Sequence, residues 1–187
     1  MLGEIWLIRH GETEWSKAGK HTSSTDLELT AEGERKAAAV GRMLAGRAFA
    51  LVLASPMRRV LATSKLAGYS AEVTPDLCEW SYGAFEGLTT AQIQVDHRGW
   101  TIWTATPPGG ETAAEVGARA DRVIERAVSA GGYVAMFGHG HMLRVLAARW
   151  LGLEPEGGRL LALSTGSFSV LGYEHDTRVI QMWNRTG

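Results

Sequence analysis

The sequence predicts an α/β fold, a three-layer α/β/α sandwich whose central sheet is mostly parallel, with an antiparallel hairpin at one edge. Three apolar stretches, 4–9, 49–54 and 133–137, are typical of short buried strands. Amphipathic helical patterns lie between them, and strands that alternate with helices favour a parallel sheet covered on both faces. The hairpin is predicted because apolar and polar residues alternate in 167–174 and 178–184.

Start signals mark the helices in the order of the chain. Thr30 suits the N-cap of the first long helix, because its hydroxyl can accept from a free N–H of the first turn. Ser55-Pro56 opens the helix after the second strand, because proline is tolerated in a first turn. Thr112 and Glu115 have the spacing of a capping box. The helix over 140–151 is apolar on most faces, so we expect it to be deeply packed.

Residues 76–110 interrupt this alternation of strands and helices. The segment follows a short predicted strand, 70–74, and its pattern favours loops with short helices. We expect it to form a small cap over the site within a single domain of residues 1–187. That length suits one domain with a core of its own.

The composition is that of an ordinary globular protein, with 45% hydrophobic and 21% charged residues. A net charge of −1 argues against general binding to nucleic acid or to an anionic membrane surface. Cys78 is the single cysteine, so an intramolecular disulfide is excluded and a reducing compartment fits. The sequence has no apolar run of transmembrane length, and residues 1–4 lack the pattern of a signal peptide. We therefore expect a cytoplasmic protein.

Two histidine–glycine pairs directly follow two of the predicted strands. Arg9-His10-Gly11-Glu12 comes after the first strand, and His139-Gly140 follows the strand 133–137 closely. In open α/β sheets, ligands bind at the carboxyl ends of the strands. A guanidinium, a titratable imidazole and a glycine at this place predict a site that handles phosphate.

The residue types at this edge suggest separate roles. His10 is the candidate nucleophile, because a neutral imidazole can form a covalent intermediate. Arg9 and Arg59 are candidate phosphate clamps, because a planar guanidinium matches phosphate oxygens. Adjacent helical positions diverge by about 100°, so one of Arg58 and Arg59 should point inward. His139, when protonated, can donate to a phosphoryl oxygen. The alternatives are hydrogen-bonded structural histidines and a solvated basic pair.

Glu79 is the candidate general acid, because its apolar neighbours would favour the protonated form of its carboxyl. The other carboxylates considered for this role are Glu12, Glu86 and Glu111. The pair His139 and His141 also suggests zinc, but histidines at i and i+2 do not share a helix face, and no third ligand cluster is evident. We therefore expect no metal and no cofactor.

Several further segments share the motifs of one family. In order, they are Leu7 to Trp15, Leu29 to Gly33, Ser55 to Arg59 with Thr63, Leu77 to Gly87, Pro108 to Thr112, and His139-Gly140. Together they resemble the histidine phosphatase superfamily, in its phosphoglycerate mutase-like branch. The resemblance is greatest to the small acid-phosphatase and sugar-bisphosphatase members, and it selects Arg59 over Arg58 as the second arginine.

The resemblance implies a two-step reaction without a metal. His10 attacks phosphorus and becomes a phosphohistidine, and Glu79 protonates the leaving oxygen and then activates water. Arg9, Arg59 and His139 hold the phosphoryl oxygens. The candidate substrate-binding residues are Ser16, His21, Thr22, Ser23, Gly140, His141, Trp100 and Trp103, with core packing as the alternative for the two tryptophans.

The main functional hypothesis is a phosphomonoester hydrolase that acts on a small phosphorylated metabolite, such as a sugar phosphate. The segment between Glu79 and Glu111 is compact and lacks the arginine-rich insertion of a cofactor-dependent phosphoglycerate mutase. That mutase is the alternative, and a catalytically silent module that binds phosphorylated ligands is the third hypothesis. The edge of the terminal hairpin also suggests a homodimer.

Overall fold

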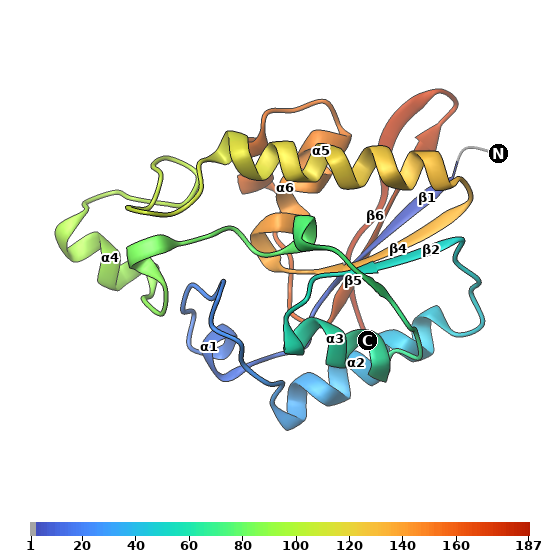
Figure 1. Ribbon diagram of the computed structural model, residues 1–187, viewed down its shortest axis with the longest axis horizontal. Helices are drawn as coiled ribbons and strands as arrows, with labels where there is room; N and C mark the ends of the chain where they lie inside the picture. Colours follow the sequence, from blue (N-terminus) through green and yellow to red (C-terminus); the bar gives the residue numbers. More distant parts are fainter. Residues whose placement is uncertain (1–2) are drawn as a thin grey trace.

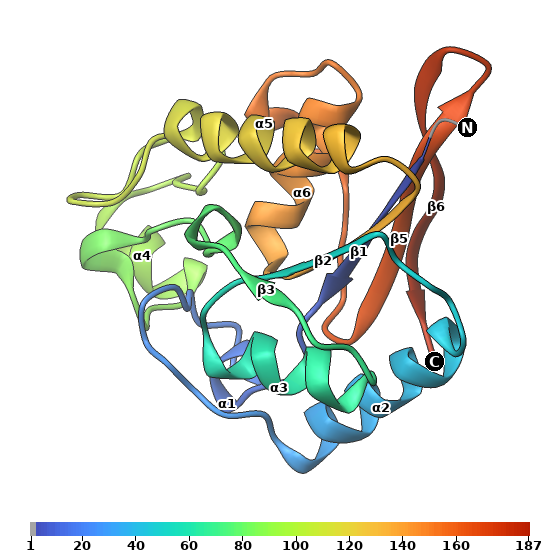
Figure 2. The same ribbon diagram turned by 45° about the vertical axis from the view of Figure 1, so that its right-hand side comes forward.

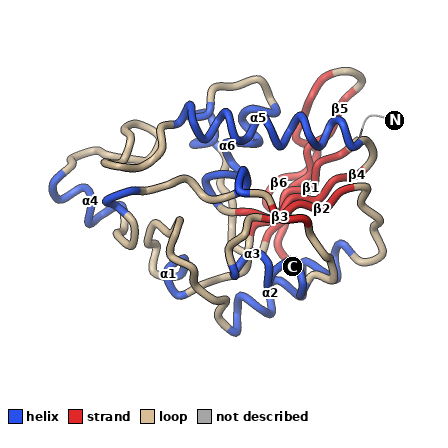
Figure 3. The backbone as a smooth tube through the Cα atoms, viewed as in Figure 1, coloured by secondary structure: helices blue, strands red, loops and turns tan. Residues whose placement is uncertain are grey.

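The computed structural model describes residues 3–187, so Met1 and Leu2 of the predicted domain lie outside the described residues. At its centre is a sheet whose described strands have the order β3-β2-β4-β1-β5-β6 (Figure 3). The pairs among β1 to β4 are parallel, whereas β5 and β6 add antiparallel pairs at one edge. This arrangement confirms the predicted α/β fold. The strands are β1 (Glu4–Arg9), β2 (Leu51–Ala54), β3 (Glu72–Val73), β4 (Tyr133–Gly138), β5 (Ser167–Glu174) and β6 (Thr177–Thr186).

Helices cover both faces of the sheet, with α2 and α3 on one face and α5 and α6 on the other (Figure 1, Figure 2). Successive strand residues point to opposite faces, so β1 contributes to two cores. Trp6 and Ile8 pack in the core on the α2 and α3 side, and Ile5 and Leu7 pack in the core on the other side. The four helices are α2 (Ala31–Leu44), α3 (Arg58–Leu66), α5 (Ala113–Ala130) and α6 (Gly140–Trp150).

Two of the predicted helix starts are confirmed. The hydroxyl of Thr30 accepts a hydrogen bond from the N–H of Gly33 (3.0 Å) and caps α2. Thr112 and Glu115 form both hydrogen bonds of the capping box at α5. These starts are predictable because each cap involves residues only three positions apart.

The predicted start of α3 at Ser55-Pro56 is wrong, because this helix begins at Arg58. Ser55 still belongs to the extended chain, since its N–H donates to the carbonyl of Phe137 on β4 (3.1 Å). The carboxylate of Asp26 then accepts from the N–H of Arg58 (2.8 Å). A partner from a distant loop satisfies the first turn, which a local sequence pattern does not reveal.

Loops and short helices lie beyond the carboxyl ends of the strands (Figure 1). Segment 76–110 contains α4 (Thr90–Asp96), and α1 (Glu14–Lys17) belongs to the loop after β1. The two loops meet where the N–H of His21 donates to the carbonyl of Leu88 (2.8 Å). Short 3₁₀ helices occupy Pro75–Leu77, Gly83–Phe85 and Pro155–Leu160. Within residues 3–187, no helix is both long and apolar enough to cross a bilayer.

A close approach of two backbone segments fixes the loop that follows β1. A Cβ atom on Gly11 would lie 2.2 Å from the carbonyl oxygen of Gly33, and one on Gly33 would lie 2.1 Å from that of Glu12. Only glycine permits this contact between the loop and α2. The N–H of Gly11 also donates to the hydroxyl of Thr63 on α3 (3.0 Å). The position of His10 is therefore set by α2 and α3 together.

Candidate active site

The carboxyl ends of β1 and β4 bring the two predicted site histidines together. Arg9 lies opposite Gly138 in the parallel register, and the N–H of His10 donates to the carbonyl of Gly138 (3.1 Å). The ring centroids of His10 and His139 are 5.2 Å apart. Residues far apart in the sequence thus form one cluster at the sheet edge where ligands bind in such folds.

The imidazole of His10 is held in one tautomer. Its Nδ1 donates to the carbonyl oxygen of Gly11 (2.7 Å), which leaves the lone pair on Nε2. Burial lowers the pKa of His10 well below its usual range, and the charges of Arg9 and Arg59 lower it further. The ring is therefore neutral at pH 7, and Nε2 is available as a nucleophile.

His139 is completely buried at the start of α6. Its Nε2 lies 2.8 Å from the hydroxyl oxygen of Ser55, the residue that follows β2. Burial lowers the pKa of His139 well below its usual range, with further contributions from Arg59 and His10. The predicted role of His139, donation to a phosphoryl oxygen, requires a second proton on this ring. Because burial disfavours that proton, a bound anion has to stabilise it.

Arg9 and Arg59 place two guanidinium groups at the cluster, and Arg9 is half-buried. Arg59 is fully buried, and its terminal nitrogens donate to the carbonyls of Thr25 (2.9 Å) and Ser23 (3.0 Å). Arg9 donates to the carbonyl of Leu163. Burial lowers the pKa of both arginines, and the nearby carboxylate of Glu79 opposes this effect.

The neighbouring Arg58 points outward. It forms an ion pair with Glu28, and its side chain is 61% exposed. Arg59 is therefore the inward member of the pair, as the resemblance implied.

Three buried nitrogen atoms at this site have no hydrogen-bond partner within residues 3–187. They are Nε of Arg9, Nε of Arg59 and Nδ1 of His139. Buried polar atoms are almost always paired, so unpaired ones need an explanation. All three belong to residues that are predicted to hold phosphoryl oxygens. The Nε–H groups of the two arginines lack acceptors, and the oxygens of a bound oxyanion can supply them.

The carboxylate of Glu79 is bound by backbone N–H groups from two segments. Its Oε1 accepts from Trp80 (2.9 Å) and Met142 (2.8 Å), and its Oε2 accepts from His141 (3.0 Å). The last two donors belong to the first turn of α6. Glu79 is 7% exposed, but its partners are polar rather than the apolar neighbours that the sequence suggested. These contacts fix the carboxylate near Arg9 and Arg59, on whose charges it acts.

The other carboxylates considered for the acid role have structural partners. Glu12 accepts from the hydroxyl of Thr30, Glu86 accepts from two N–H groups of the loop 23–25, and Glu111 pairs with Arg119. Within the described residues, Glu79 is the one glutamate that lines the cavity at the site.

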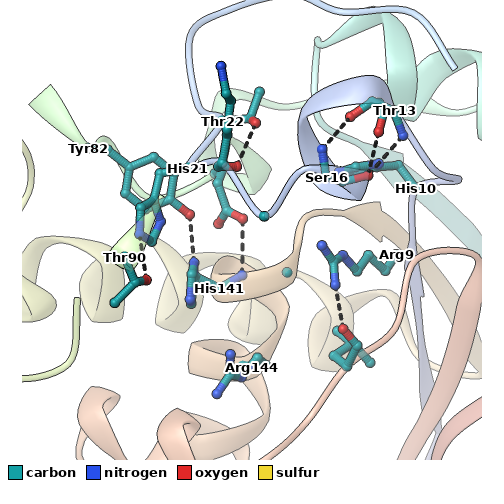
Figure 4. Close-up of a pocket in the computed structure, with 15 residues that line it drawn as sticks. Arg9, His10, Thr13, Ser16, His21, Thr22, Tyr82, Thr90, His141 and Arg144 are labelled. Atoms are coloured by element: carbon teal, nitrogen blue, oxygen red, sulfur yellow. Dashed lines mark hydrogen bonds between the residues drawn. The ribbon is translucent and has the colours of Figure 1, made fainter. Parts of the chain in front are cut away.

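A cavity of about 270 Å³ opens at the strand ends (Figure 4). It is large enough for a phosphoryl group with a small polar body attached. The predicted residues that line it are Arg9, His10, Ser16, His21, Thr22, Glu79, Gly140 and His141.

Five predicted site residues do not line the cavity. Arg59 and His139 are fully buried and are not among its lining residues, and Ser23 binds Glu86 through its N–H and Arg59 through its carbonyl. Trp100 is buried in the core, and Trp103 packs edge-on against Trp80. Neither tryptophan is among the residues that line the cavity, although Trp103 packs against His141 and Arg144, which do line it.

The structure adds lining residues that sequence reasoning missed. They are Thr13, Gly19, Lys20, Tyr82, Thr90, Arg144 and Leu163. The sequence does hold a pattern that could have identified Thr13, because Thr13 caps α1 in a capping box with Ser16. Arg144 had one too, because it lies one helical turn after His141. No sequence pattern could have identified Tyr82, because only tertiary packing brings it to the cavity. There its hydroxyl lies 2.6 Å from Nδ1 of His141.

Residues 3–187 contain no group of three or more His, Cys, Asp or Glu side chains that is placed to hold a metal ion. His139 and His141 have different partners, the hydroxyls of Ser55 and Tyr82 respectively.

A family model described as "Histidine phosphatase superfamily (branch 1)" matches residues 5–186. The chain belongs to the histidine phosphatase superfamily. This confirms the predicted family and the predicted enzyme class, a phosphatase.

Two curated proteins and one solved structure are similar to this chain. The chain is 40% identical over 188 residues to an acid phosphatase of Mycobacterium tuberculosis, covering 98% of this chain and 93% of the relative. It is 33% identical over 181 residues to a sedoheptulose 1,7-bisphosphatase of Saccharomyces cerevisiae, and the match covers 79% of this chain and 67% of that relative. The solved structure of Rv3214 from Mycobacterium tuberculosis is similar, with a TM-score of 0.93, 38% identity and 98% of both chains covered.

The buried histidines predict how the stability of this histidine phosphatase depends on pH. Burial lowers the pKa of His10, His139 and His141 in the folded state. As pH falls below about 6.5, the unfolded chain takes up protons first, so the free energy of unfolding should decrease. Each such group contributes a slope of at most about 1.4 kcal/mol per pH unit.

Urea unfolding between pH 7 and about 5.5, in a buffer without phosphate or sulfate, measures this slope. The variant His10→Ala should show a shallower slope than the wild type. A free energy of unfolding that stays constant over this range would contradict the burial argument.

Proposed function

We propose that this histidine phosphatase hydrolyses phosphomonoesters of small phosphorylated metabolites through a phosphohistidine at His10, with Glu79 as general acid and base. One observation carries the proposal. A neutral imidazole with a free Nε2 lies close to Arg9, Arg59 and His139, each of which has a buried nitrogen without a partner among the described residues. An oxyanion can pair with the two guanidinium N–H groups. The proposed cycle requires no metal or cofactor, because Arg9 and Arg59 supply the positive charge that balances the phosphoryl oxygens.

In the first half-reaction, the Nε2 lone pair of His10 forms a bond to phosphorus. The bond between phosphorus and the alcohol oxygen breaks, and that oxygen takes a proton from Glu79 and leaves as the alcohol. Arg9, Arg59 and His139 bind the other phosphoryl oxygens and disperse their charge.

The hydrogen bonds of Glu79 indicate where this proton resides. Oε1 accepts two backbone hydrogen bonds, whereas Oε2 accepts one, from His141. Oε2 therefore has a free position for a proton.

In the second half-reaction, Glu79 takes a proton from a water molecule as the water oxygen attacks phosphorus. The bond between phosphorus and Nε2 breaks, inorganic phosphate leaves, and both residues return to their starting states.

The relatives support hydrolysis, since two that match most of this chain are named as phosphatases. The low pKa of His10 supports activity in mildly acidic solution, because the nucleophile stays neutral below the usual range of histidine. A cytoplasmic location and a homodimer stay predictions from the sequence.

The test is the identity of the product. The wild-type enzyme should release inorganic phosphate from a panel of phosphorylated metabolites, including 3-phosphoglycerate with a trace of the bisphosphate. Rapid formation of 2-phosphoglycerate with little free phosphate would instead show a mutase. Stoichiometric binding without any phosphohistidine or product would show a silent binding module.

A further inference from the structure

Glu86 bridges the cap segment 76–110 and the loop 22–25, which follows α1. Its Oε1 accepts from the N–H groups of Ser23 (2.8 Å) and Thr25 (3.1 Å), and its Oε2 lies 3.0 Å from the Ser23 nitrogen. Within residues 3–187, these two N–H groups have no other acceptor. The proposed reaction does not use this carboxylate.

The carbonyl groups of the same loop bind the guanidinium of Arg59. Nη1 donates to Thr25 (2.9 Å), and Nη2 donates to Ser23 (3.0 Å) and to Thr22 (3.4 Å). Among the described residues the guanidinium has no other hydrogen-bond partner, since its Nε has none. Ser23 and Thr25 therefore contact Glu86 through their N–H groups and Arg59 through their carbonyls, so a shift of the loop shifts the guanidinium.

Other contacts hold the loop only at its two ends. At one end, the N–H of His21 donates to the carbonyl of Leu88 (2.8 Å), and the N–H of Gly87 donates back to the carbonyl of His21 (2.8 Å). At the other end, the carboxylate of Asp26 accepts from the N–H of Arg58 on α3 (2.8 Å). The backbone between these anchors depends on the carboxylate from the cap.

The position of Glu86 matters more to Arg59 than its charge does. Burial lowers the pKa of Arg59, and Glu79 and Asp26 oppose this effect more strongly than Glu86 does. Arg59 is fully buried, and a guanidinium binds an oxyanion well only when its planar fork is correctly oriented. A neutral acceptor of the same length should therefore preserve the site, whereas a shorter acid should not.

We propose that Glu86 is a positioning residue for Arg59, because it fixes the loop 22–25, whose carbonyls orient the guanidinium toward a phosphoryl group. This rests on the proposed function, in which Arg59 holds a phosphoryl oxygen. It gives Ser23, a predicted substrate-binding residue, a role through its backbone instead.

Three variants of Glu86 separate position from charge. Glu86→Ala should lower kcat/KM by about 10- to 100-fold, because a misplacement of about 1 Å can cost about 10²-fold in rate. Glu86→Gln should keep most of the activity, since its carbonyl oxygen can accept from both N–H groups. Glu86→Asp keeps the charge but is one methylene shorter, so it should be less active than Glu86→Gln. The reverse order would show that the charge matters and would overturn the proposal.

A double-mutant cycle shows whether Glu86 acts through Arg59. Arg59→Met keeps a side chain of similar length but lacks the guanidinium. In that background, Glu86→Ala should lower kcat/KM little further, because the group that it positions is already absent. If the two losses multiply instead, Glu86 acts on another part of the site and the proposal is wrong.

The control is Glu28→Gln, because Glu28 is exposed and pairs with Arg58, the outward neighbour of Arg59. It should leave kcat/KM unchanged. Thermal unfolding of every variant measures the stability of the fold. If Glu86→Ala lowers the unfolding temperature but not kcat/KM, Glu86 is only structural and the proposal fails. If Glu86→Ala does not fold, the order of Glu86→Gln and Glu86→Asp decides.

Binding of inorganic phosphate separates this proposal from the proposed function, because calorimetric titration needs no turnover. The phosphate affinity should follow the same order, with wild type and Glu86→Gln above Glu86→Asp and Glu86→Ala. If the wild type hydrolyses no phosphomonoester but the affinities follow this order, the positioning role stands and hydrolysis does not. If phosphate is released and neither kcat/KM nor the affinity changes in Glu86→Ala, hydrolysis stands and the positioning role is overturned.

Discussion

Replacing His10 with alanine should abolish phosphate release, with a loss in kcat on the order of 10⁴- to 10⁶-fold, as for other enzymes that lose their nucleophile. The reason is that Nε2 of this ring is the free lone pair beside the buried arginines. Removal of the ring leaves the cations able to bind phosphate, but no atom in that position can accept the phosphoryl group. A continuous assay of released phosphate measures the loss.

The same experiment should detect the intermediate. The wild-type enzyme, mixed with substrate and quenched in alkali, should carry one phosphoryl group at His10, because a phosphorus–nitrogen bond is stable in base. His10→Ala should carry none. The matched control is His175→Asn, which changes an exposed histidine at the turn between β5 and β6, where φ is 54° and asparagine is tolerated. If His10→Ala retains turnover, or if it loses activity only because it unfolds, the nucleophile assignment fails.

Replacing Glu79 with glutamine should cost on the order of 10²- to 10⁴-fold in kcat with alkyl phosphates. Glutamine cannot donate the proton that an alkoxide needs as it leaves. With p-nitrophenyl phosphate the loss should be much smaller, because the nitrophenolate leaves without a proton. The ratio of kcat values for the two substrates, in wild type and variant, measures this difference.

The fold of the Glu79 variant needs its own control, because an amide nitrogen facing the N–H of His141 cannot accept its hydrogen bond. Thermal unfolding shows whether α6 is affected. Glu125→Gln, an exposed change on α5, should leave both substrates unaffected. Equal losses on both substrates in Glu79→Gln would mean that this residue has a positioning role and that another group donates the proton.

The parts of the fold that were predicted correctly depend on short-range interactions. The apolar stretch 4–9 predicts a short buried strand, and β1 spans these residues. Thr30 and Thr112 cap their helices through residues three positions away. The start of α3 was predicted wrongly, and the acceptor of the Arg58 N–H in its first turn, Asp26, lies 32 residues away in the sequence.

Within the site, the sequence favoured Glu79 as the acid, with Glu12, Glu86 and Glu111 as rivals. The structure distinguishes them by partners that are far apart in the chain. Glu79 is bound by N–H groups 62 and 63 residues away, at the start of α6. Glu86 and Glu111 are engaged with the loop 23–25 and with Arg119 instead. No local pattern separates these cases, because each carboxylate has an ordinary sequence environment.

The sequence by itself determined the α/β fold and the family, and it selected the residues that we propose handle the phosphoryl group. It did so because strand periodicity, helix caps and ordered motifs act over a few residues each. Only the tertiary structure decided that His10 presents Nε2 and that Glu79 and Arg144 line the same cavity. These properties depend on burial and on partners brought together from separate elements, and the chain acquires them only when it folds.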